Sequence, residues 1–109
     1  MPDPRPFHLI LAAPPEAPGA RALVHRAAAE AASGRGWRVL LTGQGLQWAT
    51  RDGASAPLRS GGAEVVLCSK SAREQGIDPE VLPLWIRWSS LVSWLSATPA
   101  TDELWTCLP

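Results

Sequence analysis

The sequence predicts a three-layer α/β domain with a five-stranded parallel sheet, most simply in flavodoxin-like strand order. Two observations lead to this prediction. Short apolar runs alternate along the chain with segments of helical periodicity or with helix-capping residues. Glycine, proline or serine marks most of the changes between them. The 109 residues have the length of one domain with a core of its own, which we expect to span residues 1–109.

The first three elements form a β-α-β unit. Phe7–Ala13 is an apolar strand that ends at two prolines. In Ala20–Ser33, apolar residues recur every three or four positions, which is typical of a helix with one buried face. Gly34 ends this helix, and Trp37–Thr42 is the second strand. Such a unit is parallel and right-handed.

A glycine-rich turn, Gly43-Gln44-Gly45-Leu46, follows the second strand and leads into a short helix. A G-x-G at this place is compatible with a phosphate cradle, but Trp48 stands where the dinucleotide fingerprint has its third glycine. A turn that needs glycine conformations is therefore the favoured interpretation. In either interpretation, we expect Gly43, Gln44 and Gly45 to flank the functional site of the protein. Residues 52–62 then form a polar loop or a single helical turn.

A buried strand and a helix meet at Cys68. Glu64–Cys68 contains a β-branched apolar run, as in a strand covered on both faces. Ser71 and Glu74 have the spacing of a capping box, and Gly76 is a natural helix stop. The chain therefore places Cys68 at the carboxyl end of a strand, where open α/β sheets bind ligands.

This location favours a reactive thiol. Helix-start N–H groups lower the pKa of a thiol in front of them, and Lys70 and Arg73 add positive charge nearby. The alternative is that Cys68 is a small buried hydrophobe, which is common for free cysteines.

The C-terminal half supplies the last two strands. Residues 78–82 form a capped turn, Leu84–Trp88 the fourth strand, residues 91–95 a helix capped by Ser89 or Ser90, and residues 103–109 the fifth strand. Four tryptophans occur in this half: Trp85, Trp88, Trp94 and Trp105. A small domain does not bury four such side chains fully, so we expect some of them to pack against another subunit.

Composition excludes several function classes. The net charge is zero, which gives no field for nucleic acid and no polybasic membrane patch. Two cysteines without a Cys/His cluster predict neither a metal site nor a disulfide framework. No apolar signal core or membrane-spanning run is found, so we expect a cytoplasmic location. His8, near the start of the first strand, is expected to be structural rather than a base.

Three stretches together resemble the DsrE/DsrF-like small sulfurtransferases, which include the Dsr and Tus sulfur-relay proteins. They are the helix-glycine-strand segment Ala27–Leu41, the turn Gly43–Leu46, and Val65–Ile77 with its strand, cysteine, short helix and Gly-Ile. The resemblance implies a DsrE-like fold and a persulfide carrier, of transferase class if it is catalytic, with Cys68 as the sulfur-carrying residue. It implies sulfur donor and acceptor proteins as partners, a homo- or hetero-oligomer (dimer, trimer or hexamer), and no metal or organic cofactor.

Further residues are assigned around Cys68. Ser69, Lys70 and Ser71 are candidates to hold the persulfide anion through backbone N–H groups. Arg87 helps only if the fourth strand neighbours the third, and a salt-bridged or interface arginine is the favoured alternative. Cys107, a possible second thiol, lies on the same sheet edge. With one strand between them, the two Cα atoms are expected roughly 10 Å apart, too far for an unstrained disulfide.

Two other functions remain open. One is a non-catalytic assembly subunit in which Cys68 only packs and the tryptophans build a shared interface. The other is a nucleotide-binding flavodoxin-like module that uses the Gly43–Leu46 turn and the helix start at Ser69.

Overall fold

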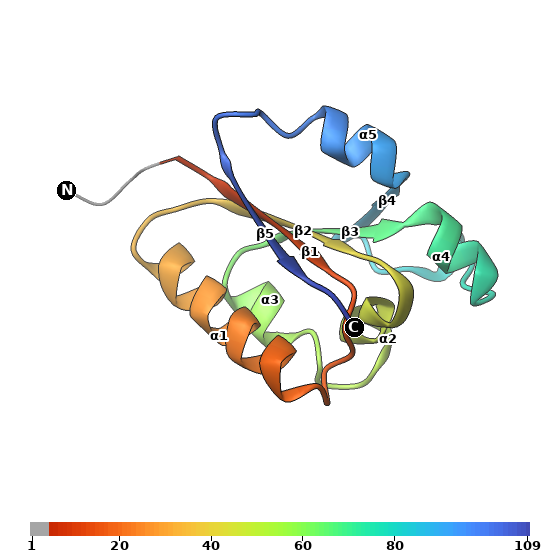
Figure 1. The fold of residues 1–109 in the computed structure, drawn as a ribbon. Coiled ribbons are helices and arrows are strands. Elements are labelled where there is room, and N and C mark those ends of the chain that lie inside the picture. Colours follow the sequence, from red (N-terminus) through yellow and green to blue (C-terminus); the bar gives the residue numbers. More distant parts are fainter. Residues whose placement is uncertain (1–4) are drawn as a thin grey trace.

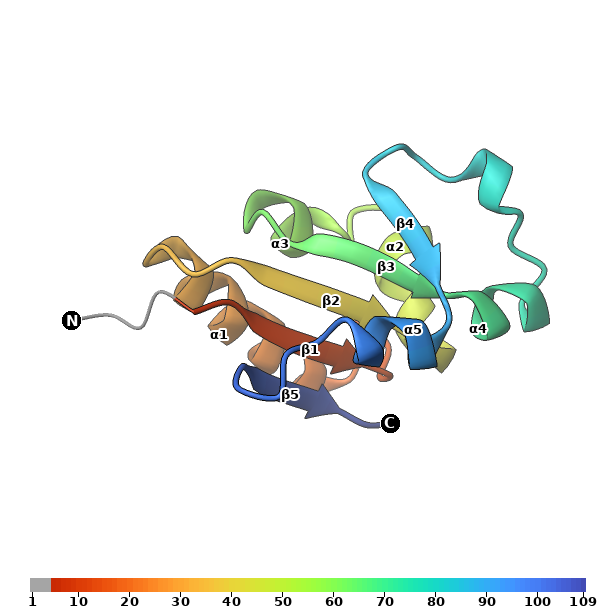
Figure 2. The same ribbon diagram turned by 90° about the horizontal axis from the view of Figure 1, so that it is seen from above.

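The computed structural model describes residues 5–109, in which five strands form one parallel sheet (Figure 1). All five strands point the same way (Figure 2), in the order β4-β3-β2-β1-β5. The strands are β1 (Phe7–Leu11), β2 (Trp37–Leu41), β3 (Glu64–Cys68), β4 (Ile86–Ser89) and β5 (Glu103–Cys107). The predicted α/β class with five parallel strands is therefore confirmed.

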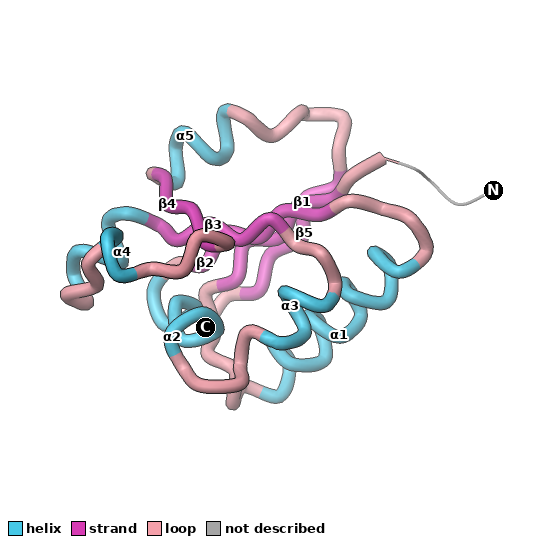
Figure 3. Tube along the Cα trace, turned by 180° about the vertical axis from the view of Figure 1, so that it is seen from behind, coloured by secondary structure: helices cyan, strands magenta, loops and turns pink. Residues whose placement is uncertain are grey.

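The predicted flavodoxin-like strand order is wrong. That order is 2-1-3-4-5, with the first strand between the second and third. Here β1 to β4 follow one another across the sheet, and only the last connection returns to place β5 beside β1. Every crossover must be right-handed, so a connection that reverses direction lies on the opposite face. Accordingly, α5 (Leu91–Ser96) lies alone on one face. The other face carries α1 (Pro18–Ala32), α2 (Gln47–Thr50) and α3 (Ala56–Ser60) (Figures 1 and 3).

Helix bounds agree with the sequence to within a few residues. The helices are α1 (Pro18–Ala32), α2 (Gln47–Thr50), α3 (Ala56–Ser60), α4 (Ser69–Glu74) and α5 (Leu91–Ser96), with 3-10 turns η1 (Gly43–Leu46) and η2 (Pro79–Val81). The buried stripe of α1 is formed by Ala20, Val24 and Ala27, and its small side chains let the helix lie close to the sheet. None of the helices within residues 5–109 is long and apolar enough to cross a bilayer.

The main core lies between the sheet and α1, α2 and α3. Leu9, Val39, Val65 and Leu67 are fully buried there. Each contributes roughly 1.5–3 kcal/mol to folding relative to an exposed side chain. This packing makes the sheet a rigid support for the residues at its carboxyl edge.

The face under α5 has a smaller core with a buried polar centre. His8 is 2% exposed, and its Nε2 lies 2.9 Å from a carboxylate oxygen of Asp102. Its Nδ1 lies 3.1 Å from Nη1 of Arg38. An arginine can only donate, so Nδ1 accepts and Nε2–H donates to Asp102. The structural role predicted for His8 is confirmed.

The turn after β2 requires glycine. Gly43 has a φ of 56°, and a Cβ on Gly45 would lie 1.9 Å from the carbonyl oxygen of Leu11. The N–H of Gly45 is bonded to the carbonyl of Thr42. These contacts support the interpretation of this segment as a tight turn.

The four C-terminal tryptophans do not gather in one place. Trp94 on α5 is buried, whereas the other three are partly exposed. Trp88 lies on β4 at one edge of the sheet, and Trp105 lies on β5 at the other, where it stacks on Phe7 with 4.7 Å between ring centroids. Trp88 and Trp105 lie at opposite edges because the connection from β4 to β5 runs back across the sheet, which the sequence pattern does not reveal.

Candidate functional site

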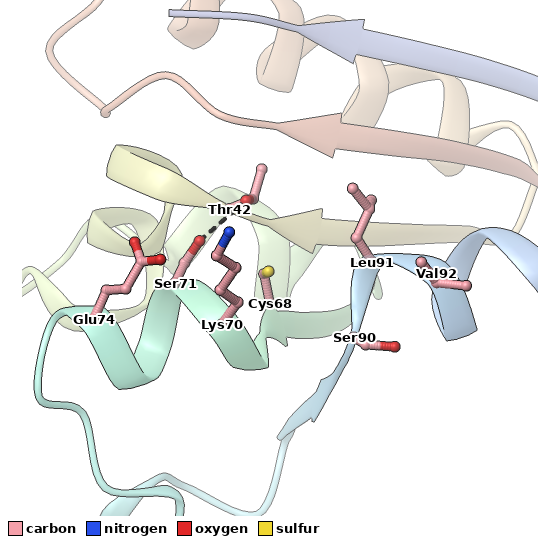
Figure 4. A pocket seen from close by; sticks show the side chains of 8 residues that line it. All are labelled: Thr42, Cys68, Lys70, Ser71, Glu74, Ser90, Leu91 and Val92. Atoms are coloured by element: carbon pink, nitrogen blue, oxygen red, sulfur yellow. Dashed lines mark hydrogen bonds between the residues drawn. The ribbon is translucent and has the colours of Figure 1, made fainter.

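Three neighbouring strands and two short helices build a pocket at the carboxyl edge of the sheet (Figure 4). Its volume is about 440 Å³. One wall comes from the end of β2 and from α4, and the other from the start of α5. The lining residues are Thr42, Cys68, Lys70, Ser71, Glu74, Ser90, Leu91 and Val92.

Cys68 lies in the pocket wall as the last residue of β3 and the residue before α4. The predicted strand-to-helix junction is confirmed, and Gly76, with a φ of 71°, follows the helix end. The residue as a whole is only 6% exposed. A small reagent can enter the pocket, whereas the flat surface of another protein cannot reach the sulfur without a projecting side chain.

Ser71 does not cap α4 as predicted. It is the third residue of the helix, and its Oγ accepts a hydrogen bond of 2.9 Å from the N–H of Gly43. It also lies 3.1 Å from Oγ1 of Thr42. The S-x-x-E pattern does not form a capping box, because the helix begins at Ser69, two residues before Ser71. The serine hydroxyl is therefore free to join α4 to the turn after β2.

Two opposing effects set the pKa of Cys68. Burial raises this pKa, because a buried thiolate loses the stabilising contact with water. Hydrogen bonds to the sulfur from the N–H and hydroxyl of Ser71, the hydroxyl of Thr42 and the N–H of Lys70 lower it. Together they outweigh burial and hold the pKa of Cys68 below its ordinary value. The thiolate is thus stabilised mainly by hydrogen bonds.

The other residues assigned around Cys68 are distributed unequally. Lys70 lines the pocket, whereas Ser69 does not, and Arg73 is exposed outside it. Arg87 is exposed as well. β4 does neighbour β3, but Cys68 pairs with Ser89, and Arg87 pairs with Val66 two residues earlier. Arg87 therefore stands two residues before the position beside Cys68, so the neighbouring strands alone do not bring it to the sulfur.

Cys107 lies farther from Cys68 than predicted. It pairs with Leu11 on β1, so both β1 and β2 stand between the two cysteine strands. Three strand spacings correspond to roughly 14 Å. Both thiols are free, and burial raises the pKa of Cys107. This separation is too large for a disulfide within one chain, and it follows from a strand order other than the predicted one.

Sequence reasoning missed several pocket residues. In the sequence, Thr42 stands only as the last residue of a strand and Glu74 only as a capping partner, while Leu91 and Val92 are part of a helix. Of the turn expected to flank the site, Gly43 contacts it: its N–H donates to Ser71, and its carbonyl accepts from Nε2 of Gln75 at 2.7 Å. A threonine directly after a buried strand, next to a strand that ends in cysteine, was the one available signal for Thr42.

Fold and site define an α/β protein with a hydrogen-bonded thiol at the carboxyl edge of a parallel sheet. No protein-family model matches the chain, and no curated protein sequence is similar to it. Solved structures do share its fold, and two of them align over nearly the whole chain. The YchN protein of E. coli superposes with a TM-score of 0.75 at 17% identity, over 94% of this chain and 99% of that one.

The second is MTH1491 of Methanobacterium thermoautotrophicum, described as a protein of unknown function. It superposes with a TM-score of 0.72 at 17% identity, over 96% of this chain and 100% of that one. At these identities the likeness concerns the fold alone. The likeness supports the α/β fold with a five-stranded parallel sheet that the sequence predicts.

Proposed function

We propose that this chain is a DsrE-like sulfur carrier of a sulfur-relay or sulfur-oxidation pathway, working in the cytoplasm. Cys68 takes up sulfane sulfur as a persulfide and passes it to a cysteine of a partner protein. The observation that carries the proposal is the Cys68 thiol, whose pKa is lowered by hydrogen bonds inside a pocket. A thiol that only filled the core would need neither the pocket nor these donors.

The sulfur is transferred in two steps. In the first, the Cys68 thiolate attacks the outer sulfur of a donor persulfide R–S–SH. The S–S bond of the donor breaks, R–S⁻ leaves, and Cys68–S–SH remains. In the second, the thiolate of the acceptor attacks the outer sulfur of Cys68–S–SH, and the Cys68 thiolate is regenerated. The hydroxyls of Thr42 and Ser71 stabilise the anionic sulfur in both steps.

The two alternative functions have less support. For a nucleotide-binding module, the turn after β2 would have to offer free N–H groups, but those of Gly43 and Gly45 are bonded to Ser71 and Thr42. For a non-catalytic assembly subunit, the observation in favour is the exposed apolar surface of α5. That surface is compatible with a carrier that also forms oligomers.

Persulfide loading tests the proposal. The chain is incubated with a sulfide- or thiosulfate-derived persulfide donor, and peptide mass spectrometry locates the added sulfur. We expect Cys68→Ser to abolish loading and Cys107→Ser to retain most of it. Loading that persists in Cys68→Ser and disappears in Cys107→Ser would reverse the roles given to the two cysteines. Absence of loading and of alkylation at neutral pH in the unmodified chain would favour the assembly subunit.

A further inference from the structure

Two opposite charges stand in the Cys68 pocket. Lys70 and Glu74 both line it, and neither forms an ion pair with any other residue among 5–109. In Figure 4 their side chains rise from α4 in the same direction, on either side of Ser71, with Cys68 next to Lys70. The pocket therefore offers a cation and an anion beside one thiol.

Lys70 and Glu74 are four residues apart, so their Cβ atoms are about 5–6 Å apart on one helix face. They can attract each other, but lysine before glutamate is the less favourable order for such a pair. Both side chains are exposed, so water screens the attraction. A ligand that carries both charges can therefore pair with Lys70 and Glu74 at once, in place of their weak attraction for each other.

The charge pattern distinguishes between kinds of sulfur donor. An inorganic polysulfide or thiosulfate is attracted by Lys70 but repelled by Glu74. A cysteine within a polypeptide has neither a free carboxylate nor a free ammonium group. A free amino acid has both, close enough together to reach the two side chains at once. The pocket, at about 440 Å³, is larger than one amino acid, and Leu91 and Val92 form an apolar wall opposite α4.

We propose that Cys68 is loaded from a low-molecular-weight zwitterionic persulfide, that is, a free α-amino acid with a terminal –S–SH group. Lys70 binds its carboxylate, Glu74 binds its ammonium group, and the persulfide extends along Leu91 to the Cys68 sulfur. The Cys68 thiolate takes the outer sulfur, and the free aminothiol leaves as its thiolate. This inference rests on the proposed function, because it names the donor for the first step.

Three donors test the two charges separately. They are the hydropersulfides of cysteine, of cysteamine, which lacks the carboxylate, and of 3-mercaptopropionate, which lacks the ammonium group. Loading rates are measured on Cys107→Ser protein, and each is divided by the rate of the same donor with a free thiol in solution. We expect cysteine hydropersulfide to be faster by about two- to fivefold over either analogue, the effect of one exposed ion pair.

The variants must lose selectivity in a defined pattern. Lys70→Gln is expected to make cysteine and cysteamine donors equal and to keep the preference over mercaptopropionate. Glu74→Gln is expected to make cysteine and 3-mercaptopropionate donors equal and to keep the preference over cysteamine. Arg73→Gln, on the same helix but outside the pocket, is the matched control and should change neither ratio. Misfolding lowers all rates together and cannot produce this crossed pattern.

Equal normalised rates for all three donors in the unmodified pocket would overturn the inference and leave the proposed function standing. The same would follow if Arg73→Gln changed the ratios as much as Lys70→Gln. If no donor loads Cys68 at all, the proposed function itself is wrong.

Discussion

Thr42 Oγ1 and Ser71 Oγ lie 3.1 Å apart, and both hydroxyls lower the pKa of the Cys68 thiol. Ser71 already accepts from the N–H of Gly43, so its own proton is available for the sulfur or for Thr42. Either arrangement directs at least one O–H at the thiolate. The turn after β2 and the start of α4 thus cooperate to stabilise one charge.

Removing the Ser71 hydroxyl should raise the pKa of Cys68. Because the hydrogen bonds favour the thiolate, the unmodified chain should be alkylated by iodoacetamide with a midpoint below the about 8.5 of a free thiol. In Ser71→Ala the midpoint should move upward, and alkylation at neutral pH should slow. The rate is followed against pH in Cys107→Ser protein, with Ser93→Ala on α5 as the control. A midpoint at or above that of a free thiol in the unmodified chain would contradict thiolate stabilisation.

The two cysteines should differ in reactivity at neutral pH. Hydrogen bonds lower the pKa of Cys68, and burial raises that of Cys107. With a limiting amount of iodoacetamide near pH 7, label should therefore appear on Cys68 first, and the difference should shrink as the pH rises and both thiols ionise. Digestion and mass spectrometry of the two peptides give the ratio. Equal labelling at neutral pH would show that the local hydrogen bonds do not control reactivity.

Gly45 should not tolerate a side chain. A Cβ there would lie 1.9 Å from the Leu11 carbonyl oxygen, so Gly45→Ala must push the turn away from β1. We expect a loss of about 3 kcal/mol in the free energy of unfolding, the upper end for overpacking. Gly19→Ala is the control, because its Cβ meets no atom within 4 Å, and it should change stability by less than about 1 kcal/mol. Denaturant unfolding of both variants gives the comparison; similar values would show that the turn moves without cost.

The two histidines should contribute very unequally to stability. His8→Leu leaves Arg38 and Asp102 without their shared partner beneath α5, so a loss of about 2–3 kcal/mol is expected. His25 is exposed on α1, and His25→Leu should stay within about 0.5 kcal/mol of the unmodified chain. Both are measured by urea unfolding at neutral pH. A small effect of His8→Leu would mean that the polar network under α5 rearranges freely.

We expect the chain to form an oligomer through the α5 face. On that face Leu95 is 38% exposed and Leu104 is 44% exposed, and the short α5 covers only part of the sheet. Leu95→Glu should therefore reduce the mass seen by light scattering at high micromolar concentration. Val81→Glu changes an equally apolar but separate surface on η2 and serves as control. A monomer in the unmodified chain at that concentration would disprove the prediction.

Local residue patterns predicted most elements of this fold. The small apolar stripe of α1 and the β-branched run before Cys68 depend on periodicity within one segment, which a single sequence displays. Helix α5 was predicted from the serines before an apolar run, and in the structure Ser90 does cap it by accepting from the N–H of Ser93, a contact within one turn. The capping role of Ser71 was misjudged, because its spacing from Glu74 fits a local cap, and only its contact with the turn after β2 shows which role it takes.

By itself, the sequence determined the α/β class, the five parallel strands and the position of Cys68 between a strand and a helix. Each of these follows from side chains that are neighbours along the chain. The tertiary structure decided the strand order, because the direction of the last crossover depends on which face α5 can cover, and no local pattern encodes that. It also decided the pocket. Thr42 reaches Ser71, and Leu91 lines the same pocket as Lys70, only because β2, β3 and β4 lie side by side, so that residues far apart in sequence meet at one edge of the sheet.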